Sequence, residues 1–305
     1  RQNKVYSSRS KPILDTTTPI AVLINRSSAS ASEIFAGVIQ DYDRGVIIGE
    51  KSFGKGLVQS MYNINDTTTL KITTAKYYLP SGRLIQKQDY MEDGFFTDGL
   101  DKKDSTFTTL NNKRVVSGGG GITPDVITER VIKSSYINAL WRKKLFLKFS
   151  SIYANGNPSI SVPVVITDEM ISDFSFFLEG YELEYLLPGE KELTKLKDKL
   201  SSYSGNNEAL SLLDKICFWR KPKRLRLIDG LYEYYDAEKK NQFNHPDNYR
   251  WIKNGLEREI SMIVGGKKEQ IRVSLNEDSD YLEAAEILKD ANRYYDILSE
   301  NSLEK

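Results

Sequence analysis

The sequence predicts an α/β core over residues 1–135, followed by a mainly α-helical domain over residues 136–305. In the first part, two short apolar runs flank an amphipathic segment between residues 19 and 49, the pattern of a strand–helix–strand unit. After residue 135, segments with helical spacing alternate with clusters of Gly, Pro, Asn and Ser. A length of 305 residues agrees with two domains of ordinary size.

The core is predicted to begin with a strand at Pro19–Asn25, whose continuous apolar run is typical of a strand buried on both faces. A second strand of this kind follows at Gly45–Gly49. Strand, helix and strand at this spacing predict a parallel pair joined by a right-handed crossover. Between them, Ser28–Asp41 is predicted to be a helix with one apolar side, formed by Ile34, Phe35, Val38 and Ile39.

The rest of the core contains one further strand and several turns. Thr67–Tyr78 alternates between polar and apolar residues like a strand, and Leu79–Arg83 has the composition of a turn. Residues 88–113 are rich in Asp, Lys and Thr and are expected to form a long loop. A glycine-rich segment, Ser117–Ile127, ends this half of the chain.

The second half is predicted to be helical, with Thr167 as the N-cap of one helix. The other expected helices are Tyr136–Ser150, Glu190–Tyr203, Ala209–Phe218, Asn248–Val264 and Tyr281–Leu298.

Composition excludes several classes of site. With 43 basic and 42 acidic side chains, the net charge is +1, so no global field steers the protein to nucleic acid or anionic lipid. No apolar run approaches the ~18 residues of a membrane span. The single cysteine, Cys217, forms neither an internal disulfide nor a cysteine metal site, and we expect it to be a buried apolar thiol. The single histidine, His245, lies in a polar stretch and is expected to be an exposed loop residue, so a lysine, carboxylate or tyrosine would have to carry any acid–base chemistry.

A run of serines between the first strand and its helix is the first candidate site. A serine at this turn lies beside a helix N-terminus, whose free N–H groups favour an oxyanion. Four serines compete for the role of nucleophile: Ser27, Ser28, Ser30 and Ser32. A purely structural role is the alternative, because Ser30 and Glu33 have the spacing of a capping box.

A lysine between two glycines, Lys55, is the candidate base. The glycines let backbone or substrate approach it closely, and an extended segment would put Lys55, Leu57 and Gln59 on one face. An ordinary lysine pKa of about 10.4 must fall by about three units for this role, which burial can achieve. The alternative is a solvated lysine in a glycine turn.

Four motifs in order resemble the C-terminal processing, or tail-specific, serine peptidases. They are Ser-Ala-Ser-Ala-Ser-Glu, Phe-Gly-Lys-Gly-Leu-Val-Gln, Leu-Lys-Ile-Thr-Thr-Ala-Lys-Tyr-Tyr-Leu-Pro-Ser-Gly-Arg and Gly-Ile-Thr-Pro-Asp-Val, within residues 19–127. The resemblance implies a crotonase-like or Clp-protease-like α/β core and a Ser–Lys dyad. Ser30 would be the nucleophile, Lys55 the general base and Gln59 its support, with the Ala31 N–H in the oxyanion hole. No metal or cofactor is implied.

The resemblance also has departures. Ser27 after Arg26 stands where the family often has glycine, which weakens the case for a second oxyanion donor there. Family members carry an upstream PDZ domain and earlier core strands, so we interpret this chain as a C-terminal fragment of a longer bacterial protein. We expect the 305 residues alone to be ordered but inactive or very weak. Residues 136–305 resemble the C-terminal domain that some envelope members carry.

The function implied is a serine endopeptidase that cleaves protein or peptide substrates near their C-termini, in the periplasm or cell envelope, with the oligomeric state left open. The alternative is a non-catalytic assembly or binding module. A basic patch at 215–227, interleaved with Phe218 and Trp219, would be its surface for nucleic acid. A solvated helix end is favoured for this patch, so no nucleic acid partner is expected. The glycines after Ser117 lack the Gly-Lys-Ser/Thr of a phosphate-binding loop.

Overall fold

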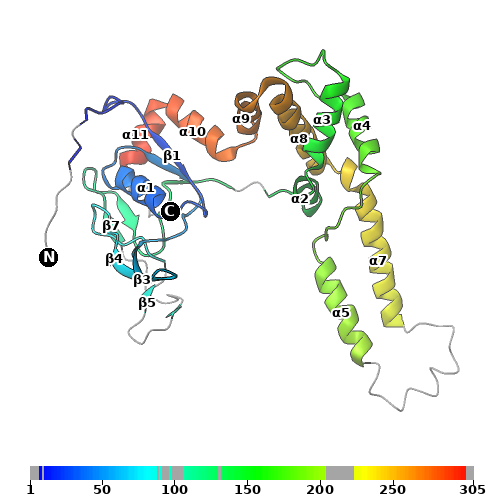
Figure 1. Cartoon of the computed structure of the whole chain (residues 1–305), viewed down its shortest axis with the longest axis horizontal. Helices are drawn as coiled ribbons and strands as arrows, with labels where there is room; N and C mark the ends of the chain where they lie inside the picture. Colours follow the sequence, from blue (N-terminus) through cyan, green and yellow to red (C-terminus); the bar gives the residue numbers. More distant parts are fainter. Residues whose placement is uncertain are drawn as a thin grey trace. The chain divides into compact units, whose positions relative to one another are not determined.

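The computed structural model divides the chain into two compact units, residues 1–131 with 278–305 and residues 132–277 (Figure 1). It describes residues 7–8, 10–87, 89–90, 96–97, 106–129, 132–203 and 223–299. The predicted helix at 209–218 therefore lies outside the described residues. No described helix has both the length and the apolar character needed to cross a bilayer.

The first unit is built on a three-stranded parallel sheet in the order β1-β2-β9. Its strands are β1 (Ala21–Ile24), β2 (Val46–Gly49) and β9 (Val126–Ile127), and α1 (Ala31–Asp41) connects the first two. The predicted strand–helix–strand unit is confirmed, with Ala21 opposite Val46 and Ile24 opposite Gly49. The α/β character of this unit follows from that crossover.

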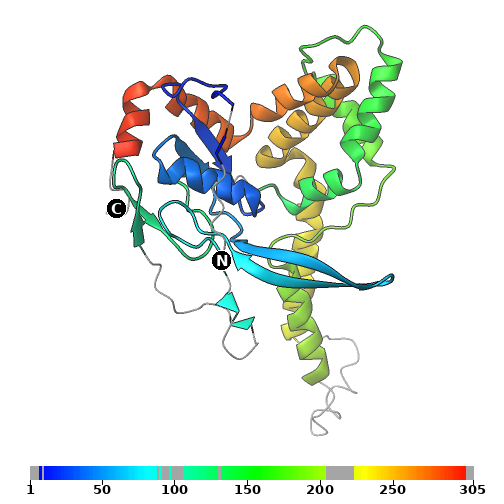
Figure 2. The same cartoon turned by 60° about the vertical axis from the view of Figure 1, so that its left-hand side comes forward.

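Helices cover both faces of this sheet, which explains why β2 is apolar throughout. Ile47 packs on the α1 side with Ala36, Leu79 and Ile122. Val46 and Ile48 pack on the other side against two helices, α10 (Ser279–Lys289) and α11 (Ala291–Ser299) (Figures 1 and 2). All three β2 side chains are fully buried. The sheet is therefore the middle of three layers.

Helices α10 and α11 pack on the sheet of the first unit, whereas the prediction placed residues 278–305 with the helical domain. The buried Tyr294 joins α11 to the core through its hydroxyl, which accepts the Ile20 N–H at 3.0 Å. The predicted helix 281–298 is also divided in two, because Asp290 ends α10 and accepts the Arg293 N–H of the next helix. Apolar surface on the open face of the sheet, rather than proximity in sequence, decides where these helices pack.

The apolar side predicted for α1 is confirmed at Ile34, Val38 and Ile39, which pack against the core, but not at Phe35. Phe35 is exposed, whereas Ala36, Gly37 and Gln40 are buried. A side chain on Gly37 would come within 2.4 Å of Leu79. Small residues on this side of α1 therefore let the Leu79 turn approach the helix closely.

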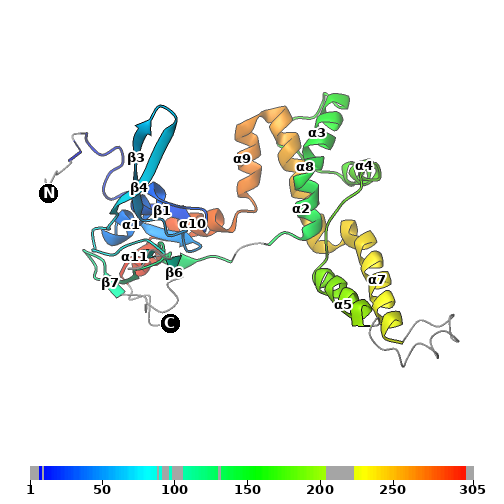
Figure 3. The same cartoon turned by 60° about the horizontal axis from the view of Figure 1, so that its bottom comes forward.

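Three antiparallel hairpins complete the strands of the first unit. The longest, β3 (Leu57–Asn65) with β4 (Thr68–Lys76), projects from the core (Figure 3). A second pairs β5 (Asp89–Tyr90) with β6 (Phe96–Thr97). The third pairs β7 (Thr106–Thr108) with β8 (Val115–Ser117), so part of the segment 88–113 predicted as loop is strand.

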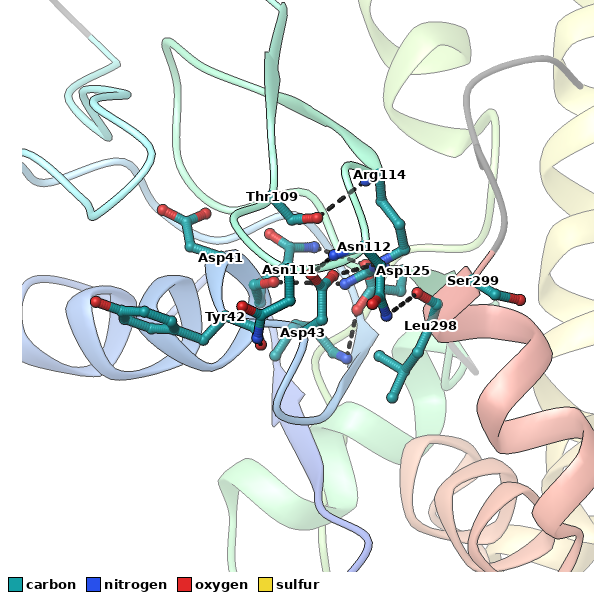
Figure 4. Close-up of polar contacts among 12 residues, drawn as sticks. Asp41, Tyr42, Asp43, Thr109, Asn111, Asn112, Arg114, Asp125, Leu298 and Ser299 are labelled. Atoms are coloured by element: carbon teal, nitrogen blue, oxygen red, sulfur yellow. Dashed lines mark hydrogen bonds and ion pairs between the residues drawn. The ribbon is translucent and has the colours of Figure 1, made fainter. Parts of the chain in front are cut away.

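A buried ionic network fixes the third hairpin to the end of α1 (Figure 4). The Arg114 guanidinium contacts Asp43 and Asp125, each at 2.7 Å, and all three side chains are nearly fully buried. Asp125 also accepts the Ile47 N–H at 2.8 Å. Burial opposes a charged guanidinium, but the two carboxylates outweigh it and raise the pKa of Arg114. The aspartate of the Gly-Ile-Thr-Pro-Asp motif thus has a structural role in holding the sheet.

The second unit is helical and has one aromatic-rich core. Its elements are α2 (Ser135–Arg142), α3 (Leu145–Gly156), α4 (Asp168–Leu178), α5 (Glu190–Tyr203), α7 (Lys223–Asn241), the 3₁₀ turn η2 (Gln242–Asn244), α8 (Pro246–Gly265) and α9 (Lys267–Leu275). The predicted helices 190–203 and 248–264 are confirmed by α5 and α8. Thr167 caps α4 by accepting the Met170 N–H, as expected.

Candidate active site

The serine-rich turn leads directly from β1 into α1 and ends at Ser30. Within it, the Ser28 N–H donates to the Asn25 carbonyl at 2.8 Å, and the Ser28 hydroxyl accepts the Asn25 N–H at 3.1 Å. Ser28 is therefore used to hold the turn. Ser30 is the N-cap residue of α1 and has φ 60° and ψ −119°, a conformation that is strained for any residue but glycine. The structural role expected for Ser30 at the helix start is confirmed, and it is compatible with a reactive hydroxyl at the same place.

The lysine loop packs tightly against neighbouring backbone on its glycine side. A Cβ on Gly54, where φ is +89°, would lie 2.7 Å from Lys87, and one on Gly56 would lie 2.9 Å from the Gln86 nitrogen. The Gly56 N–H donates to the Gln86 side chain at 2.7 Å. The close approach to these glycines that the sequence predicted is thus confirmed, and Lys55 between them is exposed.

A buried carboxylate, Glu33, connects the serine turn with the lysine loop. Its side chain is 0% exposed and accepts the Ser30 N–H at 2.9 Å and the Lys55 N–H at 2.8 Å. It also accepts the Gly54 N–H at 2.7 Å and the Ser52 hydroxyl at 2.5 Å. From the sequence, Glu33 is recognisable only as a capping-box residue. The sequence carries no signal for the three further contacts, because they come from a segment about twenty residues away.

Gln59 lies on β3 and is exposed, as Lys55 is, whereas Leu57 between them is buried. The strand register shifts between Val58 and Gln59. Lys55, Leu57 and Gln59 therefore do not share one face, as a regular extended segment would require. In the part of the chain that the structure describes, the side chains of Ser30, Lys55 and Gln59 make no hydrogen bonds to one another.

The start of α1 offers one donor for an oxyanion. The N–H groups of Ser32 and Glu33 donate to the carbonyls of Ala29 and Ser30 at 3.3 and 2.9 Å. The Ala31 N–H, at the first position of the helix, has no intrahelical acceptor, and within the described residues nothing else accepts it. Ala31 is an exposed residue, and it follows Ser30 directly.

The other candidate residues lie away from this site. His245 is an exposed residue immediately before α8, and its ring lies 3.8 Å from Asp247. Cys217 and residues 215–222 of the basic patch lie outside the described residues, while the rest of the patch begins α7. Within the described ranges, no three His, Cys, Asp or Glu side chains gather in a way that could hold a metal ion.

Two family models match this chain. Residues 1–94 match the model of peptidase family S41, which includes both the serine turn and the lysine loop. Residues 136–216 match a model described as a probable PDZ-protease, C-terminal helical domain.

Curated relatives resemble the same part of the chain. A chloroplastic C-terminal processing peptidase of Tetradesmus obliquus is 45% identical over 83 residues, which are 27% of this chain and 18% of that protein. A carboxy-terminal-processing protease of Bartonella bacilliformis is 40% identical over 118 residues, 39% of this chain and 20% of that protein. The chain thus spans about a fifth of the length of these relatives. Among solved structures, the photosystem II D1 C-terminal processing protease is 33% identical with a TM-score of 0.27, covering 38% of this chain and 22% of that one.

Proposed function

We propose that this chain, a member of the C-terminal processing peptidase family, carries the reacting residues of a serine endopeptidase that cleaves proteins near their C-termini. The single observation that carries the proposal is the joining of the Ser30 turn to the Lys55 loop. Both backbones donate to the same carboxylate oxygen of Glu33, which brings together the two segments that a Ser–Lys dyad requires.

In the proposed reaction, the Ser30 hydroxyl oxygen attacks the scissile carbonyl while the Lys55 amine takes its proton. The tetrahedral oxyanion accepts the Ala31 N–H, a contribution of about 3–4 kcal/mol for one such donor. The resulting ammonium returns the proton to the leaving amine as the peptide bond breaks. In the second half of the reaction, the Lys55 amine takes a proton from a water molecule, whose oxygen attacks the acyl-enzyme carbonyl. The ammonium then returns this proton to the Ser30 oxygen as the ester bond breaks, which frees Ser30 and releases the new carboxyl end of the product. Gln59 would orient the Lys55 side chain once substrate covers the loop.

Two further expectations belong to the same proposal. The three-layer arrangement around the parallel sheet supports a crotonase-like core, with Ser30 at the carboxyl end of β1. We propose the periplasm or cell envelope as the location, because the matched relatives are bacterial or chloroplast processing proteases. Because Lys55 is exposed, we expect the 305 residues alone to cleave weakly and a longer form to bury the lysine.

A cleavage assay tests the proposal in this chain and in any longer form that contains it. The substrate is an unfolded reporter protein with a free C-terminal tail, and the same reporter with an amidated tail tests the requirement for a C-terminus. Ser30→Ala and Lys55→Ala should each abolish cleavage, and the double variant should be no worse than either one. Lys51→Ala, an exposed lysine of the same loop, is the matched control and should cleave normally. Wild-type cleavage by Lys55→Ala would contradict the mechanism.

A further inference from the structure

We propose that Glu33 is a positioning residue of this site, and that its ionised carboxylate sets the distance between the serine turn and the lysine loop. The inference rests on the proposed function, because positioning matters only if Ser30 and Lys55 react together. Glu33 itself touches neither substrate nor the reacting atoms. Its effect passes through the backbone N–H groups of the two residues that would react.

The four contacts use the full acceptor capacity of a carboxylate. Oε2 receives the backbone N–H groups of Ser30 and Lys55, and Oε1 receives the Gly54 N–H and the Ser52 hydroxyl. The backbone nitrogens of Ser30 and Lys55 lie 2.9 and 2.8 Å from the same oxygen, so the distance between them cannot exceed the sum of these two hydrogen-bond lengths. One oxygen atom therefore fixes the spacing of the nucleophile's backbone and the base's backbone.

An ionised carboxylate satisfies all four contacts at once. Three of the partners are backbone N–H groups, which can only donate, so an amide N–H at this position would face a donor such as the Gly54 N–H. Glu33 is 0% exposed and its bonds to Gly54 and Ser52 are buried, so water cannot replace the acceptor that either donor would lose, and each unsatisfied donor costs about 1–3 kcal/mol. A glutamine of the same size would leave at least one of these groups without a partner.

The contacts go beyond those of a helix cap. Of the four bonds that Glu33 accepts, a capping box requires only the one from the Ser30 N–H, and the other three come from residues 52–55. Ser52 links Glu33 to a third segment of the chain, because its hydroxyl also accepts the Ile122 N–H at 2.7 Å. The glycine-rich segment packs closely against Ser52, since a Cβ on Gly121 would lie 2.6 Å from the Ser52 carbonyl oxygen. These glycines thus have a packing role behind the lysine loop.

The consequence for reactivity follows from the geometry of proton transfer. A base must lie within about 3 Å of the proton it removes, and a displacement of 1 Å costs about a hundredfold in rate. Glu33→Gln should therefore reduce the rate of reaction at Ser30 by about a hundredfold while the chain stays folded. The loss should fall on the maximal rate and leave binding unchanged.

The test uses a fluorophosphonate probe, which reacts with an activated serine, on this chain and on any longer form that contains it. Glu33→Gln should lower the maximal labelling rate and leave the half-saturating probe concentration unchanged. The double variant Glu33→Gln/Lys55→Ala should label no more slowly than Lys55→Ala alone, because both changes disrupt the same proton transfer. The matched control is Glu50→Gln, since Glu50 joins the same two segments through an exposed ion pair with Arg26. It should label normally.

Two further measurements keep the test decisive. If Glu33→Gln does not fold, Ser52→Ala removes one donor and retains the carboxylate, and it should label about tenfold more slowly. The amide proton resonances of Ser30, Gly54 and Lys55 should move upfield in Glu33→Gln and stay in place in Glu50→Gln. Labelling of folded Glu33→Gln at the wild-type rate would overturn the inference and leave the proposed function standing. If neither this chain nor a longer form that contains it ever labelled, the proposed function would be refuted, and unchanged amide resonances would then refute the role of Glu33.

Discussion

Replacing Arg114 with methionine should destabilise the first unit severely. The guanidinium makes two ion pairs of 2.7 Å, and the carboxylates of Asp43 and Asp125 are at most 3% exposed. Methionine fills similar volume but leaves both buried acids without their cation. Breaking a buried pair in this way costs about 3–5 kcal/mol, a large part of the 5–15 kcal/mol that stabilises a typical domain. The free energy of unfolding falls by about 1–3 kcal/mol for each molar increase in urea. The urea concentration at which half of the first unit is unfolded should therefore fall by at least about 1 M.

The distribution of tryptophan makes the assay specific for one unit. All three tryptophans, Trp141, Trp219 and Trp251, belong to residues 132–277, so their fluorescence follows only the second unit. Hydrogen exchange of the Val46–Ile48 amides follows the first unit. Arg114→Met should lose protection at these amides and leave the tryptophan transition unchanged.

The matched control for Arg114→Met is Arg26→Met, which breaks an ion pair whose arginine is 66% exposed. Such a pair contributes at most about 1 kcal/mol. If Arg114→Met proved as mild as Arg26→Met, the buried network would not stabilise the sheet.

Three other outcomes follow. The value of kcat/KM should rise with pH as Lys55 loses its proton, and a flat profile would exclude a lysine base. Tyr294→Phe should cost about 1 kcal/mol, because the part-buried Ile20 N–H loses its acceptor, and faster exchange of that amide measures the loss. Burial raises the pKa of Glu257 above its ordinary value, so the folded state binds more protons just above pH 4.5 and the stability of the second unit falls as pH rises through that window. Glu257→Gln should remove this fall, as urea midpoints from tryptophan fluorescence would show, and an unchanged pH dependence would refute the assignment.

Local pattern was sufficient to predict the elements that hold the candidate site. The continuous apolar runs around 19–25 and 45–49 predicted the two parallel strands. Burial on both faces is confirmed for β2 but not for β1, where Leu23 is 42% exposed. The helix after these serines was predicted from Ser28 and begins at Ala31, with Ser30 as the N-cap that its spacing to Glu33 had indicated. The glycines around Lys55 predicted a loop that backbone approaches closely.

What local pattern could not predict depends on long-range packing. The predicted helix 136–150 is broken at Lys144, which adopts a left-handed conformation with φ 56° although neither Gly nor Pro marks the break. The break lets Leu145 and Phe146 enter the same core as Ile137 and Leu140. Helix α7 was not predicted as such, because its tyrosines and charged residues lack a clear apolar period.

The central claim is that Ser30 is the nucleophile and Lys55 its base, and mass-spectrometric mapping of the fluorophosphonate adduct tests it most directly. Ser27, Ser28, Ser30 and Ser32 lie within six residues, so fragmentation of that one peptide must assign the modified oxygen. The account predicts an adduct on Ser30 alone, formed faster as pH rises and lost in Lys55→Ala. An adduct on another of these serines, or undiminished labelling of Ser30 in Lys55→Ala, would contradict it.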